Sequence, residues 1–218
     1  MIEVTQIRKS YGKKKVLSDI TFQVKPGECV AIAGKNGCGK STLMQIMAGI
    51  LKPDGGELCY FGKKAAYKSS TFRRFCGYVP QENPLMEELT VQDNLKLWGS
   101  HNANTKELVA QFQLEDLLQT EVSKLSGGMK RRLSIACALV ENPPFLLMDE
   151  PTTALDLYYK ESIHQWMKTY QQKNGIILMT THDESEIRNA DRCLFMDEGK
   201  VQELDAEDIL QKFAGMSE

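Results

Sequence analysis

The chain has 218 residues, of which 42% are hydrophobic and 26% are charged, and 27 basic against 29 acidic residues give a formal net charge of −2. This balance excludes a disordered chain and gives no electrostatic reason to expect nucleic-acid binding. The length suits one α/β domain that carries a helical insertion.

No apolar run reaches the roughly 20 residues that a membrane span needs, because the longest runs, such as 145–148 and 176–179, have only the length of a strand. The N-terminal segment 1–9 alternates apolar and polar residues and lacks the apolar core of a signal peptide. The six cysteines are scattered without a C-x-x-C pair or a histidine cluster, so neither zinc nor a disulfide framework is expected. We therefore expect reduced thiols in the cytosol.

The first part of the chain alternates between strand patterns, turns and one helical pattern. Its most informative segment is the wholly apolar run 29–33, which is typical of a strand buried on both faces of a parallel sheet. Helical spacing follows over 41–50 and ends at the turn 53–56. The other predicted strands here are 2–8, 16–24 and 57–61.

From residue 83 to residue 141, helical periodicity replaces the strand runs, and Thr90 to Asp93 form a plausible capping box. Beta character then returns in three runs, with a helix over 155–172 between the first two and a short helix expected from Asp205. The three predicted strands are 145–149, 176–180 and 192–196. We predict an α/β fold with a mixed or parallel sheet in a core of residues 1–82 and 142–218, an N-terminal antiparallel β subdomain, and an inserted α-helical subdomain over 83–141.

A phosphate-binding loop is predicted at GKNGCGKS, residues 34–41, which matches G-x-x-x-x-G-K-[ST] directly after a buried strand and before a helix. Glycines let backbone N–H groups face phosphate oxygens, and the helix adds about half a positive charge at its N-terminus. Lys40 can lie between the β- and γ-phosphates, and the Ser41 hydroxyl can bind Mg²⁺. The alternative, a flexible glycine-rich turn, does not explain the strand and helix on either side. The predicted nucleotide-binding residues are Gly34, Asn36, Gly37, Cys38, Gly39, Lys40, Ser41 and Thr42.

Two carboxylates, Asp149 and Glu150, end the apolar run 145–148. At the carboxyl end of a central strand beside the loop, Asp149 can hold Mg²⁺ and Glu150 can accept a proton from the attacking water. A positioned base contributes about 10²–10⁴ in rate. Taken alone, the pair would be an ordinary strand end; beside a phosphate loop, it indicates phosphoryl chemistry.

The segment Leu125-Ser-Gly-Gly-Met129 begins another helix, and here the chain resembles the ATP-binding-cassette (ABC) family, whose signature is Leu-Ser-Gly-Gly-Gln. The similarity covers residues 1 to about 205. Ser126, Gly127 and Gly128 would form a second helix N-terminus suited to an anion, although the same residues could serve only as a helix cap. The resemblance implies an ATPase in which the signature of one chain covers the ATP held by another, in a head-to-tail dimer.

The resemblance also implies roles for four further residues. Tyr11 would stack on adenine, unless it is only a turn residue of the β structure. Gln81 would reach Mg²⁺ and the attacking water and report to a membrane partner. Asp156 would lie in the loop that crosses the dimer. His182 would contact the γ-phosphate, although a lone histidine is more often structural.

Three features depart from the family pattern or add to it. Met129 replaces glutamine and so loses an amide hydrogen bond, and Met-Lys-Arg-Arg after the glycines is similar to prokaryotic exporter subunits. The basic run 130–132 is interpreted as a solvated helix face. Cys38 lies near Lys40 and a helix N-terminus, which should lower its thiol pKa and make it reactive, unless it is only a small shielded filler residue.

We therefore expect an ABC transporter ATPase subunit that binds ATP and Mg²⁺, without nucleic acid. Its expected partners are separate membrane-spanning permease subunits and a second ATPase subunit, identical or paralogous. It would lie in the cytoplasm, peripheral on the inner face of the membrane, and drive export of a drug, peptide, lipid or ion. The alternatives are a non-transport ABC ATPase acting on nucleic acid or ribosomes, and a small-molecule kinase. The stretch between Gln81 and Ser126 is too short for the coiled-coil arm of the first, and the second needs no signature.

Overall fold

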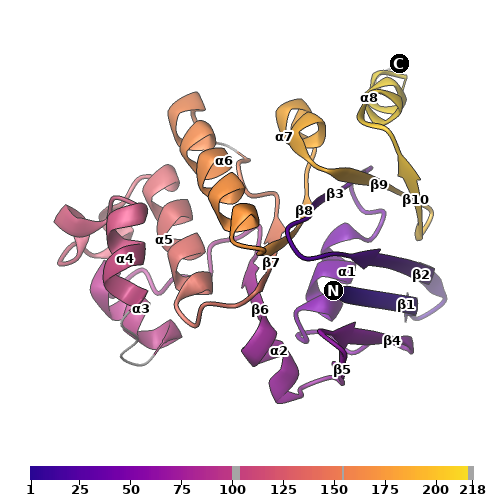
Figure 1. Cartoon of the computed structure of the whole chain (residues 1–218), viewed down its shortest axis with the longest axis horizontal. Helices are drawn as coiled ribbons and strands as arrows, with labels where there is room; N and C mark the ends of the chain where they lie inside the picture. The colour runs from indigo at the N-terminus through magenta and orange to yellow at the C-terminus, as the bar shows by residue number, and fades with distance from the viewer. Residues whose placement is uncertain (100–103, 154, 216–218) are drawn as a thin grey trace.

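The computed structural model describes residues 1–99, 104–153 and 155–215. Figure 1 shows helices α3, α4 and α5 gathered on one side, the antiparallel strands on the other, and α1 beside the two sheets. Within the described residues, no helix is long and apolar enough to cross a membrane.

The larger sheet has six strands in the order β10-β9-β3-β8-β7-β6. Its neighbours are parallel except for β10, which pairs antiparallel with β9. The central strands β3, β7 and β8 consist of short apolar runs that are buried throughout, as strands covered on both faces must be. The carboxyl ends of these three parallel strands therefore meet at one edge. The strands are β3 Cys29–Gly34, β6 Cys76–Val79, β7 Phe145–Asp149, β8 Ile176–Thr180, β9 Arg192–Asp197 and β10 Lys200–Leu204.

The smaller sheet is antiparallel, with the order β2-β1-β4-β5. It packs over α1 (Lys40–Met47), whose Leu43 and Met47 are completely buried in one core with side chains from both sheets. Burial of each such side chain contributes about 1.5–3 kcal/mol, so the start of α1 is firmly held between the sheets. The strands are β1 Ile2–Tyr11, β2 Lys14–Val24, β4 Gly55–Tyr60 and β5 Lys63–Lys64.

Between β6 and β7 the described residues form helices and a single isolated bridge between Thr90 and Glu121. The Thr90 hydroxyl accepts a hydrogen bond from the Asp93 N–H at 3.1 Å, which is the predicted cap of α3. The helices of this segment are α3 Val91–Trp98, α4 Asn104–Gln111, the 3₁₀ turns Glu115–Leu117 and Val122–Lys124, and α5 Gly127–Leu139. The remaining helices are α2 Ser70–Phe75, α6 Leu157–Gln172, α7 Glu184–Asn189 and α8 Ala206–Ala214.

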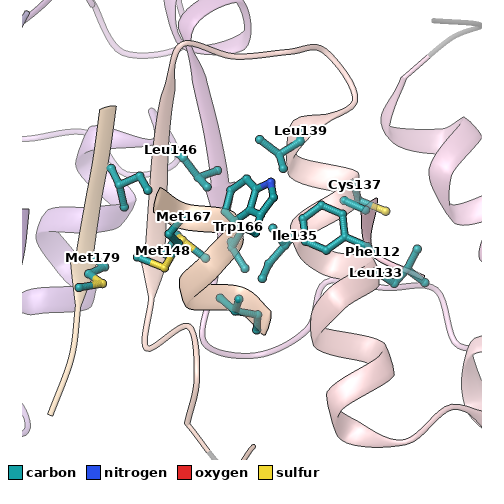
Figure 2. Close-up of a cluster of buried hydrophobic side chains, with 14 of the residues drawn as sticks. Phe112, Leu133, Ile135, Cys137, Leu139, Leu146, Met148, Trp166, Met167 and Met179 are labelled. Atoms are coloured by element: carbon teal, nitrogen blue, oxygen red, sulfur yellow. The ribbon is translucent and has the colours of Figure 1, made fainter. Parts of the chain in front are cut away.

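A second core joins these helices to the large sheet, and part of it is shown in Figure 2. Trp166 of α6 lies between Leu146 and Met148 of β7 and the apolar face of α5, with the Phe112 ring centroid 5.4 Å from its own. Because α5 is buried along most of its length, its N-terminal end is fixed relative to the carboxyl end of β7.

The predicted mixed sheet and antiparallel β unit are confirmed. The helix predicted over 155–172 begins at Leu157, because the Asp156 side chain caps it by accepting a hydrogen bond from the Tyr159 N–H at 3.1 Å. Sequence reasoning missed β5, β6, β10, α2 and α7, none of which exceeds six residues. Segments this short span too few periods for a pattern to emerge.

Candidate functional site

A cleft of about 490 Å³ lies where β3, β7 and β8 end, within the size range of small-molecule sites. The loop before α1 and the first turn of α1 contribute residues 36, 37 and 39–42 to its wall. Tyr11, Gln81, Glu150 and His182 line it from four other segments of the chain. Folding thus gathers at one place most of the residues predicted to bind or hydrolyse a nucleotide.

The backbone of the loop 34–39 favours glycine at three points, the first of which is Gly34, where a Cβ would lie 2.2 Å from the Met196 carbonyl oxygen. Gly37 has φ +76° and Gly39 has φ +114°, and a Cβ on Gly39 would meet the Leu17 side chain and the Val16 carbonyl at 3.0 Å. The loop is therefore pressed onto β2 on one side, while nothing lies within 4 Å of a Cβ at Gly37. This conformation leaves backbone N–H groups available to an anion.

Lys40, only 6% exposed, holds its ammonium over this loop. Its Nζ donates to the carbonyl of Gly34 at 2.7 Å and to that of Lys35 at 3.2 Å. These acceptors are neutral, so anionic phosphate oxygens would be stronger partners for the same charge.

Asp149 and Glu150 are oriented by Thr180 at the end of the neighbouring strand. The Thr180 hydroxyl donates to Asp149 Oδ1 and accepts the Glu150 N–H at 3.1 Å. Glu150 has φ +50°, a left-handed conformation that costs a non-glycine residue of order 1–3 kcal/mol and is concentrated at functional sites. In this conformation Glu150 lines the cleft, whereas Asp149, 3% exposed, lies behind it.

The Glu150 carboxylate receives two hydrogen bonds on Oε2. Gln81 Nε2 donates at 3.1 Å and the Thr153 hydroxyl donates at 3.1 Å. The first of these links the segment after β6 directly to the end of β7. Gln81 uses its amide NH₂ in this contact, so its carbonyl oxygen is the atom suited to a metal.

His182 Nε2 lies 3.2 Å from Lys40 Nζ and 3.4 Å from Glu150 Oε1. Burial lowers the pKa of His182, the nearby Lys40 ammonium lowers it further, and Glu150 opposes them. A lowered pKa means a neutral imidazole at neutral pH. The consistent assignment is that Nε2 accepts a hydrogen bond from Lys40, and the approach to Glu150 is then a contact and not an ion pair.

Known proteins that are similar to this chain in sequence and in fold belong to one family. Residues 17–153 fit the family model described as ABC transporter. This chain belongs to the ABC transporter family. It is an ATP-binding cassette, the ATPase component of that kind of transporter.

Curated relatives of this ABC ATPase include the Nod factor export ATP-binding protein I of Rhizobium etli, 35% identical over 98% of this chain and 71% of the relative. The protein of the same name from Paraburkholderia xenovorans is 37% identical over 91% of this chain and 68% of the relative. Among solved structures, the dimeric ATP-binding cassette MJ0796 bound to ADP and Pi has a TM-score of 0.86 at 29% identity, covering 94% of this chain and 99% of that one. An ATP binding subunit of an ABC transporter gives 0.85 at 32% identity, covering 98% and 93%.

Seven predicted residues of the ABC ATPase do not line the cleft. Gly34 and Cys38 belong to the loop beside it and Asp149 ends β7 behind it, whereas Ser126, Gly127, Gly128 and Asp156 lie at the N-terminal ends of α5 and α6. In the single chain, Ser126 caps α5, because its hydroxyl accepts the Met129 N–H at 3.3 Å. Asp156 caps α6 in the same manner. A Cβ on Gly128 would meet the Tyr159 ring at 2.6 Å, whereas one on Gly127 would meet nothing within 4 Å. The end of α5 is thus packed against α6 on one side and open on the other.

The prediction for Cys38 is wrong in its direction. Burial raises the pKa of the Cys38 thiol and outweighs the lowering effect of Lys40. The thiol is partly buried beneath the loop and does not line the cleft. Its surroundings therefore favour the less reactive thiol form at neutral pH.

The interpretation of residues 130–132 as a solvated face is also wrong. Lys130 pairs with Glu87 at 2.6 Å, but Arg131 and Arg132 are each only 5% exposed. Both are buried because this face of α5 packs against the carboxyl end of β7 and the segment after α4, where main-chain carbonyls accept hydrogen bonds from the guanidinium groups.

Sequence reasoning missed Thr180, Arg131 and Glu186 as organisers of the site. Glu186, 2% exposed, accepts hydrogen bonds from the hydroxyls of Thr152 and Thr181, and so connects the segment after Glu150 to the one before His182. Thr180 could have been found, because it stands two residues before His182 at a predicted strand end. Arg131 carries no local signal because its acceptors are 18 to 51 positions away, and the contact of Glu186 with Thr152 likewise spans 34 positions.

The donor set fits Mg²⁺ bound together with a nucleotide. Among the described residues, no cluster of three or more carboxylate, histidine or cysteine side chains could hold a metal unaided. Mg²⁺ in nucleotide sites instead takes one or two protein oxygens and completes its shell with phosphate oxygens and water. Ser41 and Gln81 supply oxygens of that kind at the cleft, and Asp149 supplies them directly behind it.

Proposed function

We propose that this chain is the ATPase subunit of an ABC exporter, which binds MgATP in the cleft and uses its hydrolysis to drive separate membrane-spanning chains. The observation that carries the proposal is the convergence of Lys40, Gln81, Glu150 and His182 on one cleft beside the glycine loop. An ammonium at a phosphate site and a carboxylate that can orient or deprotonate the attacking water are parts that recur in enzymes of phosphoryl transfer.

In the proposed mechanism, Tyr11 stacks on the adenine, and the loop 34–42 binds the phosphates. Lys40 transfers its hydrogen bonds from the loop carbonyls to the β- and γ-phosphates. Mg²⁺, held by Ser41 and Gln81 with Asp149 behind them, would supply charge neutralisation on the phosphates. All of these residues would bind the nucleotide or its metal ion before hydrolysis begins.

Glu150 then accepts a proton from the attacking water. The two hydrogen bonds on its Oε2 hold the carboxylate in place, and Oε1, which lies 3.4 Å from His182 Nε2, is the oxygen that would take the proton. When Lys40 turns its hydrogen bonds to the phosphates, Nε2 of the neutral His182 is released from its contact with Lys40. The neutral tautomer that carries its proton on Nε2 instead of Nδ1 can then donate a hydrogen bond to the γ-phosphate. Charge that develops in the transition state is thereby stabilised by groups already in position.

A second copy or a paralogue completes the site by placing the end of its own α5 over the γ-phosphate. Ser126 and Gly127 stand at a helix N-terminus whose outer side is open, and such an end favours an anion. Beside Asp156, the side chains of Leu157 and Tyr158 are 82% and 66% exposed. A second chain packed head to tail would cover these apolar groups.

The membrane partner would occupy an apolar groove of about 450 Å³ between the large sheet and the helical segment. Ile50 and Trp98, which line it, are 58% and 46% exposed. Pro80 also lines it and directly precedes Gln81, so a segment seated there would touch the loop that contacts Glu150. The chain would then lie in the cytoplasm against the inner face of the membrane. Export is favoured because relatives over most of the chain are named export ATP-binding proteins.

The test is affinity purification of the tagged full chain from detergent-solubilised membranes, followed by mass spectrometry. We expect a polytopic membrane protein at near-stoichiometric yield. Trp98→Ala should lower that yield at least fivefold, whereas Tyr67→Ala, which alters an exposed aromatic outside the groove, should not. Recovery of ribosomes or DNA without a membrane protein would refute the transporter role and leave the ATPase intact.

A further inference from the structure

Arg131 has an unusual environment for a charged side chain. It is 5% exposed, and within the described part of the chain it forms no ion pair with a carboxylate. Its guanidinium instead donates to four main-chain carbonyls. Burial lowers the pKa of Arg131 to about 10, against the opposing effect of Asp149 and Glu186, so the group stays charged at neutral pH.

The four acceptors belong to two loops of the cleft. Nη1 donates to the Pro80 carbonyl at 2.5 Å, and Pro80 directly precedes Gln81. Nη2 donates to the carbonyls of Asp149 at 2.8 Å and Glu150 at 3.0 Å, while Nε donates to that of Pro151 at 2.8 Å. One rigid, planar side chain thereby fixes the main chain on both sides of the contact between Gln81 and Glu150.

Glu150 is the residue for which this support matters most. Its left-handed φ of +50° is held from one side by Thr180, which binds its N–H, and from the other by Arg131, which binds its carbonyl. Small movements of Arg131 therefore change the orientation of the peptide that carries the Glu150 carboxylate.

Arg131 also belongs to the helix that starts at Ser126. It lies in the second turn of α5, and the intervening Gly128 is packed against the Tyr159 ring. A displacement of the end of α5 is consequently transmitted to Arg131 through a short, continuous piece of helix. In the two-chain arrangement, that end contacts the nucleotide of the other chain, whereas Glu150 acts on the chain's own nucleotide.

From these contacts we infer that Arg131 is a positioning residue that couples the two nucleotide sites of the dimer. When the end of α5 binds the γ-phosphate held by the other chain, Arg131 sets Glu150 in its own cleft for hydrolysis. The inference rests on the proposed function, because it needs two chains that share two nucleotides.

The matched control is Arg132, the next residue on α5. It is equally buried, but its Nη1 donates to the Phe112 carbonyl and the Gln113 side chain and to neither cleft loop. Arg131→Lys and Arg132→Lys each keep a positive charge and lose the planar fork. Both variants therefore bury a lysine ammonium in α5, and any loss of folding stability that this burial causes should be similar in the two.

The experiment measures ATP hydrolysis by the full chain as a function of MgATP concentration, with MgADP affinity by calorimetry and the thermal midpoint of each variant. We expect wild-type hydrolysis to be cooperative, with a Hill coefficient above 1. Arg131→Lys should lower kcat at least 30-fold and bring the Hill coefficient to 1 while MgADP affinity changes less than threefold. Arg132→Lys should leave kcat and the Hill coefficient within threefold of wild type. Arg131→Gln, with a neutral donor, should behave like Arg131→Lys.

Several outcomes would overturn the inference. Cooperative hydrolysis near the wild-type rate in Arg131→Lys would be one. Another would be a loss of activity in both Arg131 variants that only follows the fall in their thermal midpoints. Wild-type hydrolysis without cooperativity would also remove the coupling role. A wild-type chain that binds no MgADP would refute the proposed function itself, which keeps the two failures distinct.

Discussion

Replacing Glu150 by glutamine tests the proposed proton acceptor with little disturbance of the fold. The side chain is 13% exposed, and its Oε2 accepts hydrogen bonds from Gln81 and Thr153 at 3.1 Å each. A glutamine oxygen can accept both, so the free energy of unfolding should change by less than about 1 kcal/mol. An amide cannot take a proton from water at neutral pH, so only the chemical step should suffer.

The expected loss in kcat for Glu150→Gln is about 10²–10⁴, which corresponds to about 2.7–5.4 kcal/mol of activation free energy. Phosphate release at saturating MgATP measures kcat, calorimetry measures nucleotide affinity, and size-exclusion chromatography with MgATP should reveal an accumulated dimer. Thr153→Val is the control, because it removes one hydrogen bond to the carboxylate but retains the base, and it should cost less than tenfold. Turnover of Glu150→Gln within threefold of wild type would exclude Glu150 as the base.

Three further predictions concern the loop and the ionised groups. Lys40→Ala should weaken MgATP binding or turnover at least tenfold, because it removes the charge held over the loop, and full ATPase activity would contradict the assignment. Alkylation of Cys38, followed by mass spectrometry, should be slow at pH 7 and accelerate as the pH rises, since its pKa is raised; rapid reaction at pH 7 would refute this. Partial burial acts to raise the pKa of Asp183, but hydrogen bonds from Lys160 and Ser185 lower it to about 2 from an ordinary 3.8. The ionised form therefore stabilises the fold above about pH 4, and this stability is lost as the pH falls towards 2. Asp183→Asn should lower the thermal midpoint at pH 7 and have less effect near pH 2, and an equal effect at both values would contradict the linkage.

The local motifs could be predicted from the sequence because their chemistry is carried by adjacent residues. Gly37, Gly39 and Lys40 follow a buried strand directly, and the positive φ angles of the two glycines are a local property of the backbone. Asp149 and Glu150 follow an apolar run of strand length, which is predicted as a central strand and forms the buried strand β7. The roles assigned to these residues remain predictions, but their convergence on one cleft follows from parallel strands ending at one edge.

Burial could not be predicted with the same success. Residues 130–132 have the composition of a solvated face, yet Arg131 and Arg132 are buried, because main-chain carbonyls of distant segments surround them. The same holds for Cys38. The nearby Lys40 led us to expect a lowered thiol pKa, but burial of the thiol raises its pKa. In both cases the deciding quantity was desolvation, which depends on what other segments cover.

The sequence by itself determined the phosphate loop, the paired carboxylates and the positions of the central strands along the chain, because each depends on residues that are neighbours in the chain. Only the tertiary structure decided that Gln81 contacts Glu150, 69 positions away, and that Arg131 joins both loops through their carbonyls. A hydrogen bond to a main-chain carbonyl is independent of the acceptor's residue type, so it leaves no pattern in the sequence. Its partners are set by the packing of α5 against β6, which brings Arg131 to the carboxyl ends of β6 and β7.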